Sequence, residues 1–503
     1  MSTFKKVSLA IIALAVVAAV AWTALRSDQD GTARDATLRL RLESFSLGLD
    51  PANILDTQSR RIIDMLHARL IAENERGEFS AEIAERWEWI DPKGLRLTLR
   101  TGLTFSDGRP VRAQDAAWSL CRHLQPGAVF QWLFANIEHR PRDEKAVECT
   151  GLQANDDRAL TIRVLHSPAR LMHALASSMG AVVPEGSRPG EYGSVVGAGP
   201  YGVDRIESNA AVYLVQHQGG PIKPGVARVA FRYIPDDAAA AAQFAAGDLD
   251  VLEIGNPWLW EMTAKTRAKA ETRSQTVDTH QVRLLIFNLE RLQQALTWSE
   301  QEARGLMAAF REASRKPDFS KVYGDLGRPA SSAYFPARRL EEVAKLNAGV
   351  PPTAVGKGTN KVQIILENDP YSEQIVAALP RRVGSIEIGY IGLDKSLLIE
   401  RLIKREYDIA SIGLEALVAD PVYWTAFFKP GSTFNLFGRA IPQLQDVEAS
   451  NDNVAMIGRL VDEQGNWIVL FQERRQYLFA SRVTGERILP TGLIDFSRIS
   501  KKR

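Results

Sequence analysis

The sequence predicts an α/β protein, and two observations support this fold class. Apolar residues recur with a period of two in some segments and with helical spacing in others, which is the primary signal for strands and helices. In the second half of the chain the two patterns take turns: strand 362–366, helix 372–379, strand 386–391, helix 395–405, strand 409–412. Strands that alternate with helices are typical of a mainly parallel sheet covered by helices.

The first half of the chain contributes more strands than helices. Leucines alternate with arginine or threonine over residues 38–42 and 95–100, as in half-buried strands. Helical spacing over 60–71 and an alanine-rich run that ends at Gly247 predict two helices. Further helices are expected from about Ala113 and over 299–313, and further strands at 160–165, 201–206, 211–215, 229–233 and 284–288.

The composition is that of an ordinary globular protein and excludes one class of partner. The chain has 503 residues, of which 45% are hydrophobic and 24% charged, enough to bury a large core or to form several domains. Its 62 Lys and Arg nearly balance 60 Asp and Glu, for a formal charge of +2. Nucleic-acid binding requires a basic surplus, so no nucleic-acid partner is predicted.

The amino terminus carries the strongest local signal. Lys5 and Lys6 precede an almost wholly apolar run, residues 7–25, and a polar stretch follows at 26–35. The run is either a cleaved export signal, for which Ala19-Val20-Ala21 offers an A-x-A match, or a membrane anchor. The lysines favour the cytoplasmic side, so both interpretations place the polar body outside the inner membrane. No cysteine lies near the run, which excludes a lipoprotein.

The only two cysteines are Cys121 and Cys149. In an oxidising, exported compartment a disulfide between them is favoured over two separate buried thiols, although both alternatives stay open. No further cysteines exist to complete a structural zinc site of four cysteine ligands.

Motifs for catalysis and cofactor binding are absent or fail on inspection. Residues 197–202 match G-x-G-x-x-G, but Pro200 removes one N–H group and the flanking segments predict a hairpin instead of a strand and a helix. At Gly356-Lys357 the next residue is Gly358, where a Walker loop needs Ser or Thr. Neither H-E-x-x-H nor G-x-S-x-G occurs. We therefore predict no catalytic residue, no cofactor and no metal.

Two groups of aromatic residues are candidates for a ligand cleft. Trp258 and Trp260 are expected in one loop, and Tyr423, Trp424, Phe427 and Phe428 follow Asp420-Pro421. The spacing of the last three also suits one face of a helix packed into the core, which is the more common outcome.

Several short, specific strings follow one another along the chain. The most specific block reads A-E-R-W at 84–87, then F-S-D-G-R-P-V at 105–111 and A-Q-D at 113–115. This block resembles the family-5 solute-binding proteins, which include the oligopeptide-, dipeptide- and nickel-binding components of ABC importers. Further matches resemble the family's G-T-G-P-Y, I-P-D, G-E-I-D, F-N and G-x-Y-D strings, at 197–201, 234–236, 247–250, 287–288 and 404–409.

The resemblance implies a two-lobed periplasmic-binding-protein-like α/β fold with a hinge and an additional small domain. The expected division is a leader at 1–35, the small domain at 60–183, lobe II at 281–475, and lobe I at 36–59, 184–280 and 476–503. By the same resemblance the protein binds a peptide or other small solute in the cleft between the lobes. It would be a periplasmic monomer that delivers the solute to an ABC permease complex at the inner membrane.

One departure from the family bears on the solute. Peptide-binding members hold the ligand's ammonium with the aspartate of a G-W-x-A-D string, and here residues 413–417 read G-L-E-A-L. Glu415 is the proposed replacement, with Asp420 as another option and a solvated loop carboxylate as the alternative. A membrane-anchored sensor or partner-binding protein of the same fold is the second functional hypothesis, and an exported enzyme the third. The expected ligand-binding residues are Phe45, Trp258, Asn288, Leu414, Glu415, Leu417, Asp420 and Tyr423.

Overall fold

The computed structural model describes residues 37–329 and 360–502, apart from 46, 55, 75, 167–169, 317–318, 369, 417–421, 433–434, 436, 446, 448–453 and 490. The apolar run at 7–25 and two of the predicted ligand-binding residues, Leu417 and Asp420, therefore lie outside the described residues. Within the described part, no helix has the length and apolar character needed to cross a membrane.

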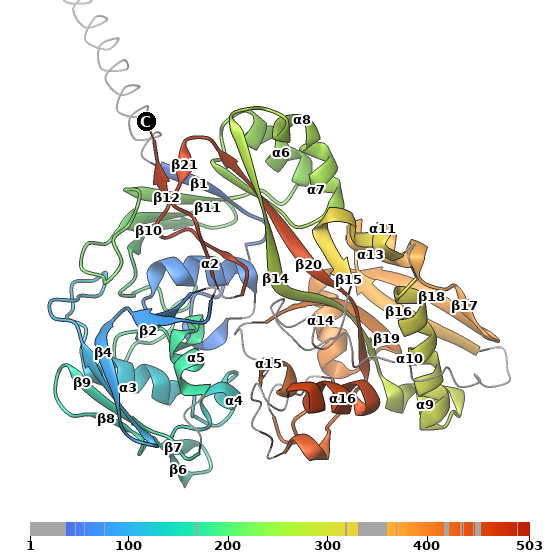
Figure 1. Cartoon of the computed structure of the whole chain (residues 1–503), viewed down its shortest axis with the longest axis horizontal. Coiled ribbons are helices and arrows are strands. Elements are labelled where there is room, and N and C mark those ends of the chain that lie inside the picture. The colour runs from blue at the N-terminus through green and yellow to red at the C-terminus, as the bar shows by residue number, and fades with distance from the viewer. Residues whose placement is uncertain are drawn as a thin grey trace, which may run out of the picture.

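Two bodies lie side by side and share one twelve-stranded sheet (Figure 1). The strand order is β10-β11-β12-β1-β13-β20-β14-β19-β16-β18-β17, with β15 (Gly327–Pro329) paired to β20. Two long strands, β14 (Thr272–Phe287) and β20 (Trp467–Ala480), run antiparallel from one body into the other. The fold is mixed α/β, as the alternating sequence patterns predict.

The first body is built on the part of this sheet that contains β10, β11, β12, β1 and β13. β1 (Thr37–Leu42) is parallel to both β12 (Arg228–Tyr233) and β13 (Val251–Ile254). The predicted hairpin is confirmed as β10 (Tyr201–Glu207) and β11 (Ala211–Gln216). Helices α6 (Asp237–Ala245), α7 (Pro257–Met262) and α8 (Ala264–Arg267) follow β12 and β13.

A small second sheet belongs to the same side of the molecule. Its order is β4-β5-β9-β8, and the short pairs β2-β3 and β6-β7 lie beside it. A disulfide joins Cys121, at the end of α3, to Cys149, whose Cα atom is 5.8 Å away. The bounds are β2 (Ile71–Glu73), β3 (Phe79–Ala81), β4 (Ala84–Asp91), β5 (Gly94–Leu99), β6 (Arg140–Asp143), β7 (Ala146–Glu148), β8 (Leu152–Ala154), β9 (Ala159–Arg163), α3 (Ala113–Arg122), α4 (Gln131–Phe134) and α5 (Leu171–Ala176).

The second body contains the alternating strands and helices of the second half of the chain. β16 (Asn360–Glu367) is parallel to β18 (Ile386–Leu393) and β19 (Ile409–Glu415), which confirms the parallel arrangement predicted there. The edge strand β17 (Arg382–Val383) and the crossing strand β14 are antiparallel to their neighbours. Its helices are α9 (Leu289–Leu296), α10 (Glu300–Ser314), α11 (Ser320–Tyr323), α13 (Pro370–Ala378), α14 (Lys395–Lys404), α15 (Val422–Thr425) and α16 (Val454–Gln464).

The crossing strands change register where they pass between the bodies. From Thr272 to Asp278, β14 pairs with the carboxyl-terminal half of β20, and from Val282 onward it pairs with the amino-terminal half. The residues between form a bulge, which bends a strand and increases its twist. Gln472 donates a hydrogen bond from its Nε2 to the Thr279 carbonyl at 2.6 Å and so satisfies a backbone acceptor within the bulge. The bend therefore lies midway between the two bodies.

Helix α2 (Thr57–Leu66) begins and ends for local reasons. The Asp56 side chain accepts a hydrogen bond from the Ser59 N–H and caps the first turn. The predicted span of 60–71 was wrong at both ends, because the chain turns into extended backbone at His67. Gly197 and Gly199 pack against this end: a Cβ at either position would lie within 2.5 Å of Leu66 backbone atoms. The G-x-G-x-x-G string is thus a close-packing element beside a hairpin.

Two expectations about aromatic residues need correction. Trp258 and Trp260 lie on helix α7, not in a loop, because Asn256 caps that helix through its side chain and Pro257 suits the first position. The helix after Asp420 is only one turn long, and Phe427 lies beyond it. Trp424, Phe427 and Phe428 nevertheless pack in the core, around Trp467.

Candidate ligand site between the two bodies

Helix α2 brings two arginines into the space between the bodies. Its apolar residues Ile62, Ile63 and Leu66 are fully buried in the core of the first body. The preceding Arg60 and Arg61 are also buried, with side chains 4% and 6% exposed. Arginine is rarely buried without ionic partners, so this pair points to a network of charges.

The first carboxylate of this network is Glu253, which interrupts the apolar strand β13. It contacts Arg61 of α2 on one side and Arg475 of β20 on the other. Arg475 also donates to the Gln281 amide oxygen at 2.5 Å, at the bulge of β14. Glu253 thus connects the first body to the strands that cross between the bodies.

The second carboxylate is Glu415, at the carboxyl end of β19 in the second body. It accepts a hydrogen bond from Arg60 Nη1 at 3.2 Å and another from Thr57 Oγ1 at 2.5 Å. Its Oε2 lies 3.7 Å from Arg475 Nη2. Arg60 reaches Asp64 on its other side, at 3.8 Å.

These six groups form a chain of alternating charge that crosses the interface, in the order Arg61, Glu253, Arg475, Glu415, Arg60, Asp64. We call it the interlobe ion-pair chain. Burying each charge costs several kcal/mol, and the neighbouring opposite charge offsets that cost only where the geometry is close. The interlobe ion-pair chain therefore stabilises the arrangement in which the two bodies meet.

Electrostatics differ between the two ends of the chain. Burial works against the charge of Arg475, but attraction to Glu415 and to neighbouring acidic residues outweighs it and raises the pKa of Arg475. Arg61, at the terminus, is different: burial lowers its pKa below the ordinary guanidinium value, against the pull of its neighbours. Arg61 is thus less well compensated than Arg475.

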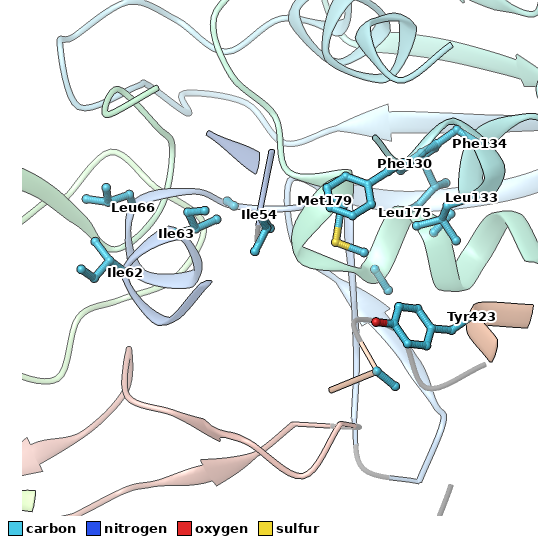
Figure 2. Close-up of a cluster of buried hydrophobic side chains, with 14 of the residues drawn as sticks. Ile54, Ile62, Ile63, Leu66, Phe130, Leu133, Phe134, Leu175, Met179 and Tyr423 are labelled. Carbon is cyan, nitrogen blue, oxygen red and sulfur yellow. The ribbon is translucent and has the colours of Figure 1, made fainter. Parts of the chain in front are cut away.

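Aromatic packing closes the other side of the interface. Tyr423 of α15 meets Trp132 of α4 edge to face, with ring centroids 5.9 Å apart. Figure 2 shows Tyr423 in one cluster with Leu133 and Met179 of the first body. Burial raises the pKa of Tyr423, so the phenol is neutral at physiological pH.

The structure brings only some of the predicted ligand-binding residues to this interface. Glu415 and Tyr423 lie in it, and Leu414 precedes Glu415 on β19, opposite Val282. Phe45 lies just beyond β1, half-buried, with its ring 5.9 Å from that of Tyr233.

The remaining described candidates lie elsewhere. Trp258 is 49% exposed on α7. Asn288 caps α9 by accepting from the Arg291 N–H and donates to the Arg405 carbonyl. Asn288 directly follows Phe287, the last residue of β14. Phe287 is six residues from Gln281, which pairs with Glu415, so Phe287 and Gln281 lie roughly 20 Å apart along the strand. Asn288 is therefore engaged at the start of α9, and a ligand-binding role for Trp258 and Asn288 stays a prediction.

Sequence reasoning missed Arg60, Arg61, Glu253 and Arg475. A signal for Glu253 was present, because a carboxylate in the apolar run from Val251 to Ile254 is unusual for a buried strand. The arginines follow no motif, and their partners come from segments far apart in the sequence.

Among the described residues, no group of three or more His, Cys, Asp or Glu side chains has the arrangement of a metal site. The interface is instead made of arginine–carboxylate pairs and aromatic side chains. Such groups recognise a charged organic solute through hydrogen bonds and apolar contacts.

Part of the sequence matches a known family. The family model described as "Bacterial extracellular solute-binding proteins, family 5 Middle" matches residues 78–313. Residues 78–313, a little under half of the chain, are therefore similar to this family. Family 5 is a family of solute-binding proteins, not of enzymes. The match also confirms the resemblance inferred from the short sequence strings.

Curated relatives that match part of this chain are periplasmic binding proteins of Escherichia coli (strain K12). The periplasmic murein peptide-binding protein MppA is 29% identical over 220 residues, and the periplasmic oligopeptide-binding protein OppA is 22% identical over 224. The nickel-binding periplasmic protein is 25% identical over 194 residues. The alignment with MppA spans 41% of this chain and 41% of MppA, so the matched part is about two-fifths of each protein.

Solved structures extend the likeness in fold to almost the whole chain. The E. coli murein tripeptide binding protein MppA matches with a TM-score of 0.73 and 18% identity, over 93% of this chain and 98% of MppA. Listeria monocytogenes OppA bound to peptide matches with a TM-score of 0.74 and 14% identity, over 93% and 99%. The unliganded open form of MppA matches less well, with a TM-score of 0.62.

Proposed function

We propose that this protein captures a peptide or peptide-like solute between its two bodies and delivers it to an ABC importer. The observation that carries the proposal is the interlobe ion-pair chain, in which Glu415 of the second body meets Arg60 of the first. A binding protein needs two lobes that close on a solute and that part again to release it. A contact made of hydrogen-bonded charges suits this task, because both partners regain water when the lobes part.

Lobe motion in this proposal takes place at the crossing strands. Their register changes between Asp278 and Val282, and bulges are sites where strands bend. Lobe I is taken as 36–59, 184–280 and 476–503, lobe II as 281–475, and the small domain as 60–183. The boundary at residues 280–281 falls within the bulge, which supports the division.

The solute class follows from the interface and from the relatives. Paired arginines and carboxylates match a molecule that carries both charges, as a peptide does. MppA is named for a murein peptide and OppA for oligopeptides. The Glu415 carboxylate already accepts hydrogen bonds from Thr57 and Arg60, so a solute ammonium bound to Glu415 shares the carboxylate with these groups.

Native mass spectrometry of the protein purified gently from periplasm tests the proposal. We expect a mass excess equal to one bound solute, and denaturing analysis should then identify a peptide or peptide-like molecule. A protein that is always empty, and whose melting temperature no member of a peptide library raises, contradicts it. That outcome favours an anchored sensor or a partner-binding role for the same fold.

A further inference from the structure

A small cavity opens beside the end of the ion-pair chain. Its volume is about 10 Å³, and its charged lining residues are Arg41, Glu43, Arg61 and Glu253. Arg41, Glu43 and Glu253 lie at the carboxyl ends of the parallel strands β1 and β13. In open α/β sheets, ligands bind outside the carboxyl ends of parallel strands, which makes this the expected place for a ligand group.

Arg61 is the terminal and least satisfied cation of the chain. Arg60 and Arg475 each pair with two carboxylates, whereas Arg61 contacts Glu253, which it shares with Arg475. The Arg61 Nε is buried and has no hydrogen-bond partner within the described part of the chain. A buried N–H without an acceptor costs about 1–3 kcal/mol, so an additional acceptor is favoured at this atom.

Arg41 also lines the cavity and is held by several partners. Its Nε donates to the Ile234 carbonyl at 2.8 Å, and its Nη2 pairs with Asp237 at 2.7 Å. Its Nη1 lies 3.6 Å from Glu43. Glu43 is 45% exposed, so of the two carboxylates that line the cavity it is the one that can turn into solvent and release Arg41.

We propose that Arg61, with Arg41 as a second donor, holds a carboxylate of the solute at the carboxyl ends of β1 and β13. This proposal rests on the proposed function and makes it more specific, since solutes with a free carboxylate are then preferred over the matching amides. A cavity of about 10 Å³ holds roughly one water, so the carboxylate enters while the lobes are apart and Glu43 turns to solvent. The planar guanidinium then offers two parallel N–H donors to it.

Four tripeptides test the preference by isothermal titration calorimetry on the full chain. They are Ala-Glu-Ala and Ala-Gln-Ala, each with a free carboxyl terminus or a carboxamide. The wild-type protein should bind at least one free acid about tenfold to a hundredfold more tightly than its matching amide. Equal affinity for every acid and its amide overturns the assignment to a carboxylate and leaves the proposed function intact.

Variants locate the preference at Arg61. Arg61→Gln should reduce the acid-to-amide ratio to below about threefold while amides still bind, and Glu253 keeps its contact with Arg475 in this variant. Arg61→Lys keeps the charge without the planar fork and should give an intermediate ratio. Arg232→Gln is the matched control, because it also removes one positive charge. Arg232 follows Phe231 on β12, and because Phe231 lines the cavity, the Arg232 side chain lies on the opposite face of the strand. An unchanged ratio in Arg61→Gln overturns the assignment.

A second probe decides the question if no tripeptide binds, an outcome that would contradict the peptide part of the proposed function. Acetate at 100 mM is compared with chloride at equal ionic strength in thermal unfolding. If acetate binds with a Kd of about 10 mM, the wild-type Tm should rise by about 1 °C. Arg61→Gln should show no such rise. An acetate effect that is absent, or that is the same in both proteins, overturns the inference.

Discussion

Glu415 and Arg60 lie 355 positions apart in the sequence, and their Oε1 and Nη1 atoms are 3.2 Å apart in the structure. One belongs to the last parallel strand of the second body and the other to the first long helix of the first. Their contact joins the two bodies directly. It gives the arrangement of the lobes an electrostatic component that substitution can measure.

Glu415→Gln should weaken the contact between the bodies. The variant leaves Arg60 with Asp64 and Arg475 with Glu253, so we expect a loss of about 2–3 kcal/mol, below the 3–5 kcal/mol typical of a buried pair broken on one side. Urea unfolding measures the loss. Glu387→Gln, at an exposed pair with Lys361, is the control and should change stability by less than about 0.5 kcal/mol. Equal effects of the two substitutions would contradict the role of Glu415.

Two buried histidines should make the protein less stable in mild acid. Burial is the main cause that lowers the pKa of His67 and of His123 to about 4, although Ser194 and Met179 carbonyls accept hydrogen bonds from their Nε2 atoms. The unfolded chain binds a proton to each imidazole below about pH 6.5, which the folded protein resists. Stability is therefore lost as the pH falls from about 6.5 to about 4.

The expected size of this effect is roughly 2 kcal/mol for each histidine between pH 7 and pH 5. Urea unfolding at the two pH values measures it, and His123→Gln should reduce the difference by that amount. His166→Gln serves as control, since it removes an exposed imidazole and should leave the difference unchanged. A pH dependence of unchanged size in His123→Gln would rule out this histidine as one of its sources.

Removal of the disulfide should destabilise the part of the first body that carries the small sheet β4-β5-β9-β8. Cys121 and Cys149 are 28 positions apart, and a loop of this length corresponds to about 3–4 kcal/mol of lost chain entropy in the unfolded state. The double variant Cys121→Ser, Cys149→Ser is expected to have a free energy of unfolding lower by that amount, measured by urea unfolding. Reduction of the wild-type protein with dithiothreitol should reproduce the shift and leave the double variant unaffected. A reductant effect on the double variant would show that the shift has another cause.

Gly199→Ala should disturb the packing of helix α2. Its Cβ would lie 2.5 Å from the Met65 carbonyl oxygen, a distance that forces the backbone apart. We expect a loss of roughly 1–3 kcal/mol, as for other overpacked sites, measured as a lower urea midpoint. Gly255→Ala is the matched control, because no atom of the described residues lies within 4 Å of its added Cβ. A loss in the control equal to that in Gly199→Ala would show that the close contacts of the added Cβ are not the cause of the loss.

Element type was predictable from the sequence wherever the apolar period was regular. The strands and helices between residues 360 and 415 lie close to their predicted bounds, since their side chains alternate between core and solvent. Boundaries were less predictable. Helix α2 begins at Thr57 because the Asp56 side chain caps it, and the isolated Trp258 and Trp260 gave no periodic pattern from which helix α7 could be recognised.

The sequence by itself determined the α/β class, the family resemblance and the absence of recognisable catalytic motifs, because each is written in local spacing. Only the tertiary structure decided which charges meet. Arg61, Glu253 and Arg475 come from a helix and two strands that the fold brings together. In the sequence alone, each of them is a charged residue of a type that usually lies on the surface. A buried ion pair depends on the distance between partners and on the loss of water around both, and these are properties of the folded chain.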